Sequence, residues 1–274
     1  AQPTKLQLER RQVYYLLLKG LFMKDISQLY SEHPEFYDSF SKDRDFLSQC
    51  RSLLDFSSPT DPNDVTTLEL LAGPARHSQA FSQLGCKAYS LDGSEGMKKY
   101  SVAKGIQHEA NYFVSHLPAD KPKIPPDLKF NIYTLLRYSI GYFSKESIQW
   151  LLKWCQHHSR KNGILFVKVH KQSTFNNFIE IHEDSHIISD SELGKVECYW
   201  PVNPPEWSDT EWEIKMIVKV IINGETHFYE SREIIHSYED IRHISESVGC
   251  KAEIIPPQKL SGFTDNAHIV AIYL

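Results

Sequence analysis

Short apolar segments alternate with amphipathic ones through the middle of the chain. We predict a strand where apolar residues follow one another in a short segment, and a helix where they recur every three or four positions. The predicted strands are 65–71, 87–91, 107–111, 130–136 and 163–170, and the predicted helices between them are 76–84, 95–104 and 145–159. Strands that alternate with helices in this way are typical of a doubly wound, mostly parallel sheet, so we expect an α/β fold.

The pattern changes after residue 170. Residues 171–212 are polar and aromatic, and two segments of alternating apolar residues then stand on either side of Asn223 and Gly224. This arrangement is the strongest short-range signal for an antiparallel hairpin. We therefore expect a hairpin inserted after the fifth strand of the sheet.

The end of the chain returns to the strand and helix pattern. A helix is predicted at 237–249, because Ser237 can cap its first turn and Gly249 can end it. Strands at 251–255 and 267–274 bring the predicted sheet to seven strands. The expected fold is therefore a doubly wound, mostly parallel seven-stranded sheet, with helices before it and the antiparallel hairpin as an insertion.

These elements divide the chain into four segments. Residues 1–60 have apolar positions spaced for helices and are predicted to form an N-terminal helical cap. Residues 61–170 make the main part of the α/β core, and residues 237–274 complete it. Residues 171–236, which hold the aromatic residues and the hairpin, are predicted to form a separate inserted unit.

The composition is that of an ordinary soluble globular protein. Of the 274 residues, 41% are hydrophobic and 24% are charged, and the formal net charge is -5. A mildly acidic chain argues against broad binding to a phosphate backbone, so we expect no nucleic-acid partner. No apolar segment has the length of a membrane span, and the polar start of the chain has no signal-peptide core. We therefore expect a cytoplasmic protein without a membrane partner.

The five cysteines are widely scattered and include no Cys-x-x-Cys pair. Neither a zinc ribbon nor a thioredoxin-type site is predicted, and we expect no metal. Reduced structural thiols fit a cytoplasmic protein better than disulfides do.

The most informative turn is LELLAGPARHS at residues 68–78, between the first strand and its helix. A glycine turn at this place puts backbone N–H groups at the carboxyl edge of a sheet, where doubly wound folds bind ligands. The positions of a Gly-x-Gly-x-x-Gly motif hold Gly73, Ala75 and Ser78, so the fit to a pyrophosphate is poor. No Walker lysine follows, which disfavours a nucleoside triphosphate.

Two acids stand near the ends of neighbouring strands. Asp92 follows the second strand, where a carboxylate can accept hydrogen bonds from two ribose hydroxyls. Glu69 stands four residues before Gly73 and has two interpretations: it binds a ligand, or it caps a helix or forms a salt bridge. Gly73 and Asp92 at the matching strand ends favour the ligand-binding interpretation.

The sequence resembles the class I S-adenosylmethionine-dependent methyltransferases, in particular those that act on small molecules. The segments ELLAGPARHS and SLDGSEGM are similar to the first two motifs of that family, and HEANYFVSHLP, FNIYTLLRYSIGYF and NGILFVKV to the next three. The upstream segment HPEFYDSF is similar to a Tyr-Asp segment found before the core of small-molecule members. The resemblance covers about residues 30–274. It implies a Rossmann-like methyltransferase fold, with 61–170 as the cofactor-binding core and 171–236 as a lid over the substrate.

The resemblance also implies where S-adenosylmethionine is bound. The first-strand acid and its glycine turn would line the methionine end, Asp92 would bind the ribose, and Met97 would pack near the adenine. The third motif has Asn111 where an acid usually stands beside the adenine amino group. The cofactor-binding residues implied in this way are Glu69, Ala72, Gly73, Ala75, Asp92, Gly93, Met97, Asn111, Tyr112 and Leu135.

Contacts with the methyl acceptor are expected after the fourth and fifth strands. Methyl transfer from a sulfonium needs mainly alignment of nucleophile, methyl and sulfur, and a base only where the acceptor arrives protonated. The guanidinium of Arg137 can grip a carboxylate, with a surface ion pair as the alternative. Tyr138 either hydrogen-bonds the acceptor or only packs, and His170 is the candidate base. Trp200 and Trp207 are predicted to wall the lid around a planar or apolar acceptor.

We therefore expect an enzyme that transfers a methyl group from S-adenosylmethionine to an oxygen or nitrogen of a small molecule and leaves S-adenosylhomocysteine. The acceptor is expected to be carboxylate-bearing or aromatic, and the protein to be a monomer or a homodimer. The alternative is a catalytically inactive protein of the same fold that serves as a binding or regulatory subunit. Asn111 and Asn131, which replace acids of the family motifs, keep that alternative open.

Overall fold

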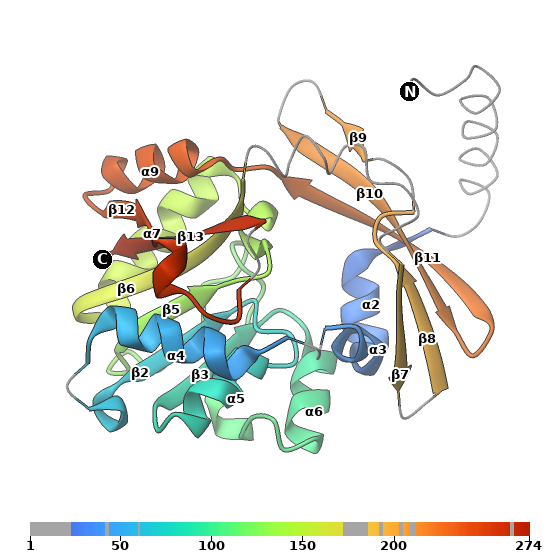
Figure 1. Cartoon of the computed structure of the whole chain (residues 1–274), viewed down its shortest axis with the longest axis horizontal. Coiled ribbons are helices and arrows are strands. Elements are labelled where there is room, and N and C mark those ends of the chain that lie inside the picture. Colours follow the sequence, from blue (N-terminus) through green and yellow to red (C-terminus); the bar gives the residue numbers. More distant parts are fainter. Residues whose placement is uncertain are drawn as a thin grey trace.

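The computed structural model describes residues 23–41, 44–59, 61–171, 186–191, 194–202, 205–208, 212–263 and 266–274. This part of the chain forms two β-sheets with helices around and between them (Figure 1). Residues 1–22, the first part of the predicted N-terminal helical cap, lie outside the described residues.

The larger sheet has seven strands in the order β12-β13-β6-β5-β2-β3-β4. All neighbouring pairs from β6 to β4 are parallel, while β13 is antiparallel to both β6 and β12. The predicted doubly wound, mostly parallel sheet is confirmed. Its strands are β2 (Thr66–Leu70), β3 (Lys87–Asp92), β4 (Tyr112–Val114), β5 (Phe130–Leu135), β6 (Ser159–His170), β12 (Lys251–Ile254) and β13 (Ala267–Tyr273).

The third strand lies later in the chain than predicted. Residues 107–111 end in a 3-10 turn, which the His108 side chain caps by accepting a hydrogen bond from the backbone N–H of Ala110. The strand itself begins at Tyr112 and pairs only with β3. The prediction of 107–111 is wrong because three residues at a sheet edge have too few apolar positions to show a period.

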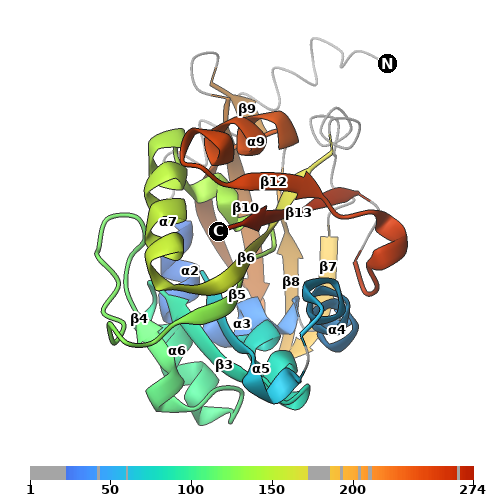
Figure 2. The same cartoon turned by 90° about the vertical axis from the view of Figure 1, so that its left-hand side faces the viewer.

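Helices cover both faces of this sheet (Figure 2). On one face α7 and α9 share a core with the sheet in which Leu151 and Val167 are fully buried. On the other face α4 and α5 share a second core, with Leu53 and Phe166 fully buried. None of the helices in the described residues is long and apolar enough to cross a membrane. The helices are α4 (Phe46–Ser57), α5 (Arg76–Gln83), α6 (Glu95–Ala103), α7 (Lys145–His158) and α9 (Tyr238–Ser247).

The smaller sheet is built around the predicted hairpin. Its strand order is β1-β11-β10-β8-β7, and β9 pairs with β10. Asn223 and Gly224, which join β10 to β11, have φ angles of 51° and 86°, as a type I′ turn requires. The strands are β1 (Lys24–Asp25), β7 (His186–Ser191), β8 (Gly194–Tyr199), β9 (Glu206–Trp207), β10 (Glu213–Ile222) and β11 (Glu225–Ile234).

The structure extends the hairpin into a sheet that the sequence pattern does not predict. β8 lies in a segment rich in polar residues, but Val196 and Cys198 are buried in one core with Val218 and Val220 of β10. These side chains gain their apolar surroundings only when β8 pairs with β10. Burial in a shared core therefore outweighs the weak strand pattern.

Two helices, α2 (Ile26–Glu32) and α3 (Pro34–Ser39), lie between the two sheets (Figure 1). Leu29 of α2 and Tyr229 of the smaller sheet are both fully buried in one core. On its other side α2 meets the start of α6, where a Cβ at Gly96 would run into the carbonyl of Ser31. The helices thus join the smaller sheet to the carboxyl ends of the larger one.

Candidate functional site

A cavity of about 640 Å³ lies where the carboxyl ends of β2, β3 and β5 face α2. Its volume falls within the roughly 300–1,000 Å³ that is usual for small-molecule sites. Four of the predicted cofactor-binding residues line it, namely Gly73, Asp92, Gly93 and Met97. Sequence reasoning missed the wall that α2 contributes, because no local signal places this helix over the sheet edge. The α2 residues of that wall are Ile26, Ser27, Tyr30 and Ser31.

The turn after β2 has left-handed residues at every second position. Leu71, Gly73 and Ala75 have φ angles of 49°, 52° and 66°. This conformation costs a residue with a Cβ roughly 1–2 kcal/mol. Only the middle residue is a glycine, and a Cβ built there would meet Cε1 of Tyr37 at 3.4 Å. The turn therefore keeps the geometry of a glycine-rich loop with two non-glycine residues, of which Leu71 lines the cavity.

Asp92 joins this turn to the one after β3. Its Oδ2 accepts a hydrogen bond from the backbone N–H of Gly73 and its Oδ1 from that of Ser94, each at 2.8 Å. Burial raises the pKa of Asp92, and the two amide hydrogen bonds act in the opposite direction. Since each carboxylate oxygen has a second lone pair, Asp92 can still accept hydrogen bonds from the hydroxyl groups of a ligand.

Glu69 is buried beneath the turn and does not line the cavity. Its Oε2 accepts hydrogen bonds from the backbone N–H and the hydroxyl of Ser78, at 2.8 and 2.9 Å. Its Oε1 lies 2.9 Å from Nδ1 of His77. The carboxylate therefore holds the first turn of α5 against β2, in line with the helix-capping interpretation of Glu69.

Four further predicted residues lie behind the cavity wall. Ala72 and Ala75 are buried beneath the turn, and the hydroxyl of Tyr112 donates to the carbonyl oxygen of Gly73. Leu135 is fully buried in the core of the larger sheet. None of the four side chains lines the cavity, and the hydrogen bond from Tyr112 holds the turn from behind.

Asn111 does not line the cavity either. Its side-chain amide donates to the carbonyl oxygen of Ala88 at 3.3 Å, at the start of β4 rather than at its end. His116 and Leu117, which follow β4, line the cavity instead. A Cβ at Gly93 would lie 2.6 Å from Nδ1 of His116, so a larger residue here would displace the exposed His116 ring. If β4 had been predicted at its correct place, His116 and Leu117 would have been expected at the edge of the sheet.

The predicted acceptor residues meet beside the cavity. Arg137 and Tyr138, which follow β5, have left-handed φ angles of 66° and 64°. The guanidinium carbon of Arg137 lies 4.6 Å from the centre of the ring of Tyr37, which lines the cavity. Tyr138 stacks on His170, with ring centres 3.9 Å apart and planes 7° from parallel. The structure therefore joins Tyr138 to His170 and brings Arg137 to the cavity wall.

Lys168 adds a cation to this group. Its Nζ lies 4.5 Å from the centre of the Tyr138 ring. Burial, together with the charges of Arg44 and Arg137, lowers the pKa of Lys168 to about 8. Burial and the charge of Lys168 lower the pKa of His170 to about 4, so the imidazole is neutral at neutral pH.

A second polar group links the smaller sheet to the cavity. The hydroxyls of Tyr30 and Tyr142, which both line the cavity, are 3.1 Å apart. Glu233 of β11 interacts electrostatically with both tyrosines, and burial raises the pKa of Glu233 to about 7. No sequence signal marks Glu233, because its surroundings depend on how the hairpin is seated on the larger sheet.

The two tryptophans predicted for the substrate site belong to the smaller sheet and do not line this cavity. Trp200 packs edge-on against Phe40, with ring centres 6.4 Å apart. Trp207 of β9 packs in the same way against Trp212, at 6.2 Å. Their rings thus contact other aromatic residues of the inserted segment and the helices next to it.

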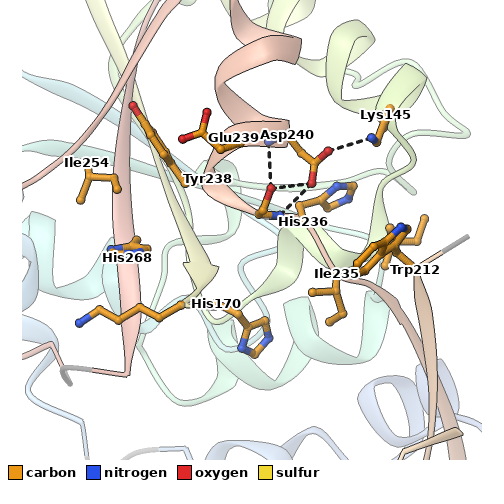
Figure 3. A pocket seen from close by; sticks show the side chains of 13 residues that line it. Lys145, His170, Trp212, Ile235, His236, Tyr238, Glu239, Asp240, Ile254 and His268 are labelled. Carbon is orange, nitrogen blue, oxygen red and sulfur yellow. Dashed lines mark hydrogen bonds and ion pairs between the residues drawn. The ribbon is translucent and has the colours of Figure 1, made fainter. Parts of the chain in front are cut away.

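A second cavity, of about 470 Å³, lies at the carboxyl end of β6 beside the start of α9 (Figure 3). His170, His268 and Trp212 are among the residues that line it. Lys145 and Asp240, an ion pair of 2.8 Å, stand at its upper side in Figure 3. His170 therefore borders this second cavity, and its ring also stacks on Tyr138.

Comparison with solved structures identifies the fold. A S-adenosylmethionine-dependent methyltransferase from Clostridium acetobutylicum superposes with a TM-score of 0.62 and 14% identity, over 87% of this chain and 96% of that chain. The Streptomyces venezuelae protein DesVI has a TM-score of 0.64 and 14% identity, over 87% and 97%. The sugar N-methyltransferase KedS8 from a Streptoalloteichus species has a TM-score of 0.64 and 14% identity, over 86% and 92%. The chain thus has the fold of S-adenosylmethionine-dependent methyltransferases.

No protein-family model matches the sequence, and neither does any curated protein.

Proposed function

We propose that this protein transfers a methyl group from S-adenosylmethionine to an oxygen or nitrogen of a small molecule that carries a carboxylate or an aromatic group. The observation that carries the proposal is the Asp92 carboxylate, held by the amides of Gly73 and Ser94 in the wall of the cavity at the sheet edge. The amino pentose methyltransferase CalS10 and the glycopeptide N-methyltransferase MtfA, which share this fold, have S-adenosylmethionine bound in their structures.

The residues of the cavity fit this cofactor. Asp92 offers a carboxylate to two ribose hydroxyls, while Met97 and Leu117 offer apolar surface to a flat base. The rings of Tyr30 and Tyr37 can stabilise a sulfonium cation by cation–π interaction. When bound, S-adenosylmethionine supplies a methyl group activated by its positively charged sulfur.

The acceptor is proposed to bind beside Tyr37. Arg137, whose guanidinium packs on that ring, orients an anionic group of the acceptor, and Tyr138 supplies a hydroxyl. His170 is a weak base because its pKa is lowered to about 4, so its main proposed task is to hold the Tyr138 ring by stacking. Positioning of the acceptor is then the main contribution of these side chains to the rate.

A second candidate is a protein that binds the cofactor without turnover. Leu71 favours it, because this side chain lines the cavity at a position with a left-handed backbone conformation that suits glycine. The two candidates differ in a simple way: both bind S-adenosylhomocysteine, and only the first consumes S-adenosylmethionine when an acceptor is added.

Calorimetric titration with S-adenosylhomocysteine tests the proposal. We expect binding to the wild-type protein, and an Asp92→Ala variant should bind about 5- to 150-fold more weakly, which corresponds to the loss of a charged hydrogen bond of about 1–3 kcal/mol. Asp127→Ala, on an exposed loop, is the matched control and should leave the affinity unchanged. Thermal denaturation shows whether Asp92→Ala is folded, and Asp92→Asn is the replacement if it is not. Equal affinity in the folded Asp92 variant and the control would contradict the ribose assignment.

A further inference from the structure

Three cationic side chains from separate parts of the chain interact electrostatically around the ring of Tyr138. Arg44 lies just before α4, Arg137 follows β5, and Lys168 lies in β6. The charges of Arg44 and Arg137 both act on Lys168, so the three side chains are electrostatically close. We call Arg44, Arg137 and Lys168 the cation cluster.

Two members of the cation cluster have aromatic rather than acidic partners. Within the described residues, Arg137 and Lys168 form no ion pair with a carboxylate; Arg137 lies over the ring of Tyr37 and Lys168 over that of Tyr138. Yet the side chain of Lys168 is nearly buried, with 9% exposed. By contrast, Arg76, which is also partly buried, is paired with the carboxylate of Asp38. A buried ammonium with a second cation nearby is unfavourable unless an anion joins it, and such arrangements are typical of binding sites.

The backbone holds this arrangement under strain. Arg137 and Tyr138 are consecutive non-glycine residues with left-handed φ angles of 66° and 64°. Such residues persist where the surrounding structure determines them, and they cluster at ligand-binding sites. Here the strained pair places the guanidinium on Tyr37 and the phenol ring under the ammonium of Lys168.

We propose that the cation cluster binds a doubly charged anionic group, such as a phosphate monoester, of the methyl acceptor. The guanidinium of Arg137 offers a planar pair of donors that matches phosphate, and the Lys168 ammonium adds a point charge. Arg137 and Lys168 together carry two positive charges, which a dianion neutralises further than a single carboxylate does. Tyr37 both lines the cofactor cavity and supports Arg137, so an acceptor anchored here lies next to the cavity.

This proposal rests on the proposed function, since it names the substrate class of the same site. It also makes anion binding depend on pH. Among the residues that the structure describes, the charged and titratable groups that act on Lys168 or on its partner ring are Arg44, Arg137, Tyr138 and His170, and none of these is a carboxylate. The pKa of Lys168 is lowered to about 8, so the ammonium loses its proton as the pH rises through that value.

Sulfate is a suitable probe, because it stays doubly charged between pH 7 and pH 9. We expect calorimetry without any cofactor to show sulfate binding to the wild-type protein at pH 7, and acetate binding at least tenfold weaker. Lys168→Met and Arg137→Gln should each weaken sulfate binding at least tenfold. Lys161→Met, at the exposed far end of the same strand, is the matched control and should bind like the wild type. Equal sulfate affinity in Lys168→Met and Lys161→Met would overturn the site, and equal binding of acetate and sulfate would overturn its preference for a dianion.

A comparison of sulfate binding at two pH values keeps the test independent of folding defects in the variants. The wild-type protein should lose sulfate affinity severalfold between pH 7 and pH 9, whereas Lys168→Arg, which stays charged, should keep it. A loss of the same size in both proteins would contradict the role of Lys168.

A final pair of ligands distinguishes an acceptor from a free anion. In the presence of S-adenosylhomocysteine, 4-aminophenyl phosphate should bind at least tenfold more tightly than 4-aminophenol. If the two bind equally while sulfate still binds, the assignment to the acceptor fails. If sulfate binds and S-adenosylhomocysteine does not, the anion site at the cation cluster is supported and the proposed methyl transfer is contradicted. If S-adenosylhomocysteine binds and sulfate does not, the proposed methyl transfer is supported and the anion site is contradicted.

Discussion

The carboxylate of Glu69 accepts a hydrogen bond from the backbone N–H of Ser78, with 2.8 Å between Oε2 and nitrogen. This bond joins the end of β2 to the first turn of α5, across the turn that lines the cavity. The acid that the sequence motif associates with ligand binding therefore holds the loop in place from below. Asp92, in contrast, lies at the cavity wall, where its carboxylate can accept hydrogen bonds from a ligand.

Glu69 is expected to matter for stability more than for binding. Glu69→Ala leaves the N–H of Ser78 buried without an acceptor, which should lower the free energy of unfolding by about 1–3 kcal/mol. Urea denaturation at pH 7 measures this change. Glu109→Ala, an exposed acid in a turn, is the control and should change stability by less than about 0.5 kcal/mol. A large loss of S-adenosylhomocysteine affinity with unchanged stability would point back to ligand binding.

The left-handed backbone at Ala75 predicts which residues can replace it. Ala75→Gly should change the free energy of unfolding by about 1 kcal/mol or less, because relief of the strain is offset by the greater freedom of glycine in the unfolded chain. Ala75→Val should cost at least about 2 kcal/mol, since a branched side chain is added to a strained and fully buried position. The same two substitutions at Ala103, at the exposed end of α6, serve as controls measured in the same denaturation series. If valine lowered the free energy of unfolding equally at positions 75 and 103, this result would argue against backbone strain at Ala75.

The close contact of α2 with α6 predicts a binding defect at a distance. Gly96→Ala places a methyl group against the carbonyl of Ser31 and should push α2 away from the cavity that it lines, at a cost of about 1–3 kcal/mol. We expect lower thermal stability and weaker binding of S-adenosylhomocysteine together. Lys99→Ala, on the exposed side of α6, should change neither. Full retention of affinity in Gly96→Ala would show that α2 does not shape the site.

Glu233 predicts a stability difference between pH 5 and pH 8. Burial raises its pKa to about 7 from an ordinary value of 4.5, so between these values the folded protein keeps a proton that the unfolded chain releases. Its stabilising contribution is complete below pH 4.5 and is lost as the pH rises through about 7. Glu233→Gln cannot titrate, so this variant should lose less unfolding free energy than the wild type between pH 5 and pH 8. Urea denaturation at pH 5 and pH 8 measures this difference in unfolding free energy. Glu225→Gln, at an exposed position, is the control. The same pH response in wild type and Glu233→Gln would rule the carboxyl out as its source.

Local pattern in the sequence was enough to predict six of the seven strands of the larger sheet. Strands of a parallel sheet are buried on both faces, so β6 contains a nearly continuous apolar segment, and β2 and β5 are short segments that carry apolar residues between amphipathic helices. Asn223 and Gly224 likewise marked the hairpin, because few residues tolerate the two positive φ angles of its turn. The position of Asp92 at the end of a strand could be predicted from the same local pattern.

The partners of each site residue were decided by the tertiary structure alone. Tyr37, Arg137 and Lys168 are far apart in the chain, and no periodicity predicts that Arg137 packs on Tyr37 or that its charge acts on Lys168. The sequence also placed a carboxylate at residue 69, but whether it holds a ligand or a backbone amide depends on where α5 begins relative to β2. A local pattern reflects which faces of a segment are buried, whereas a binding site depends on distances between segments, and those are set by the packing of the sheets and helices on one another.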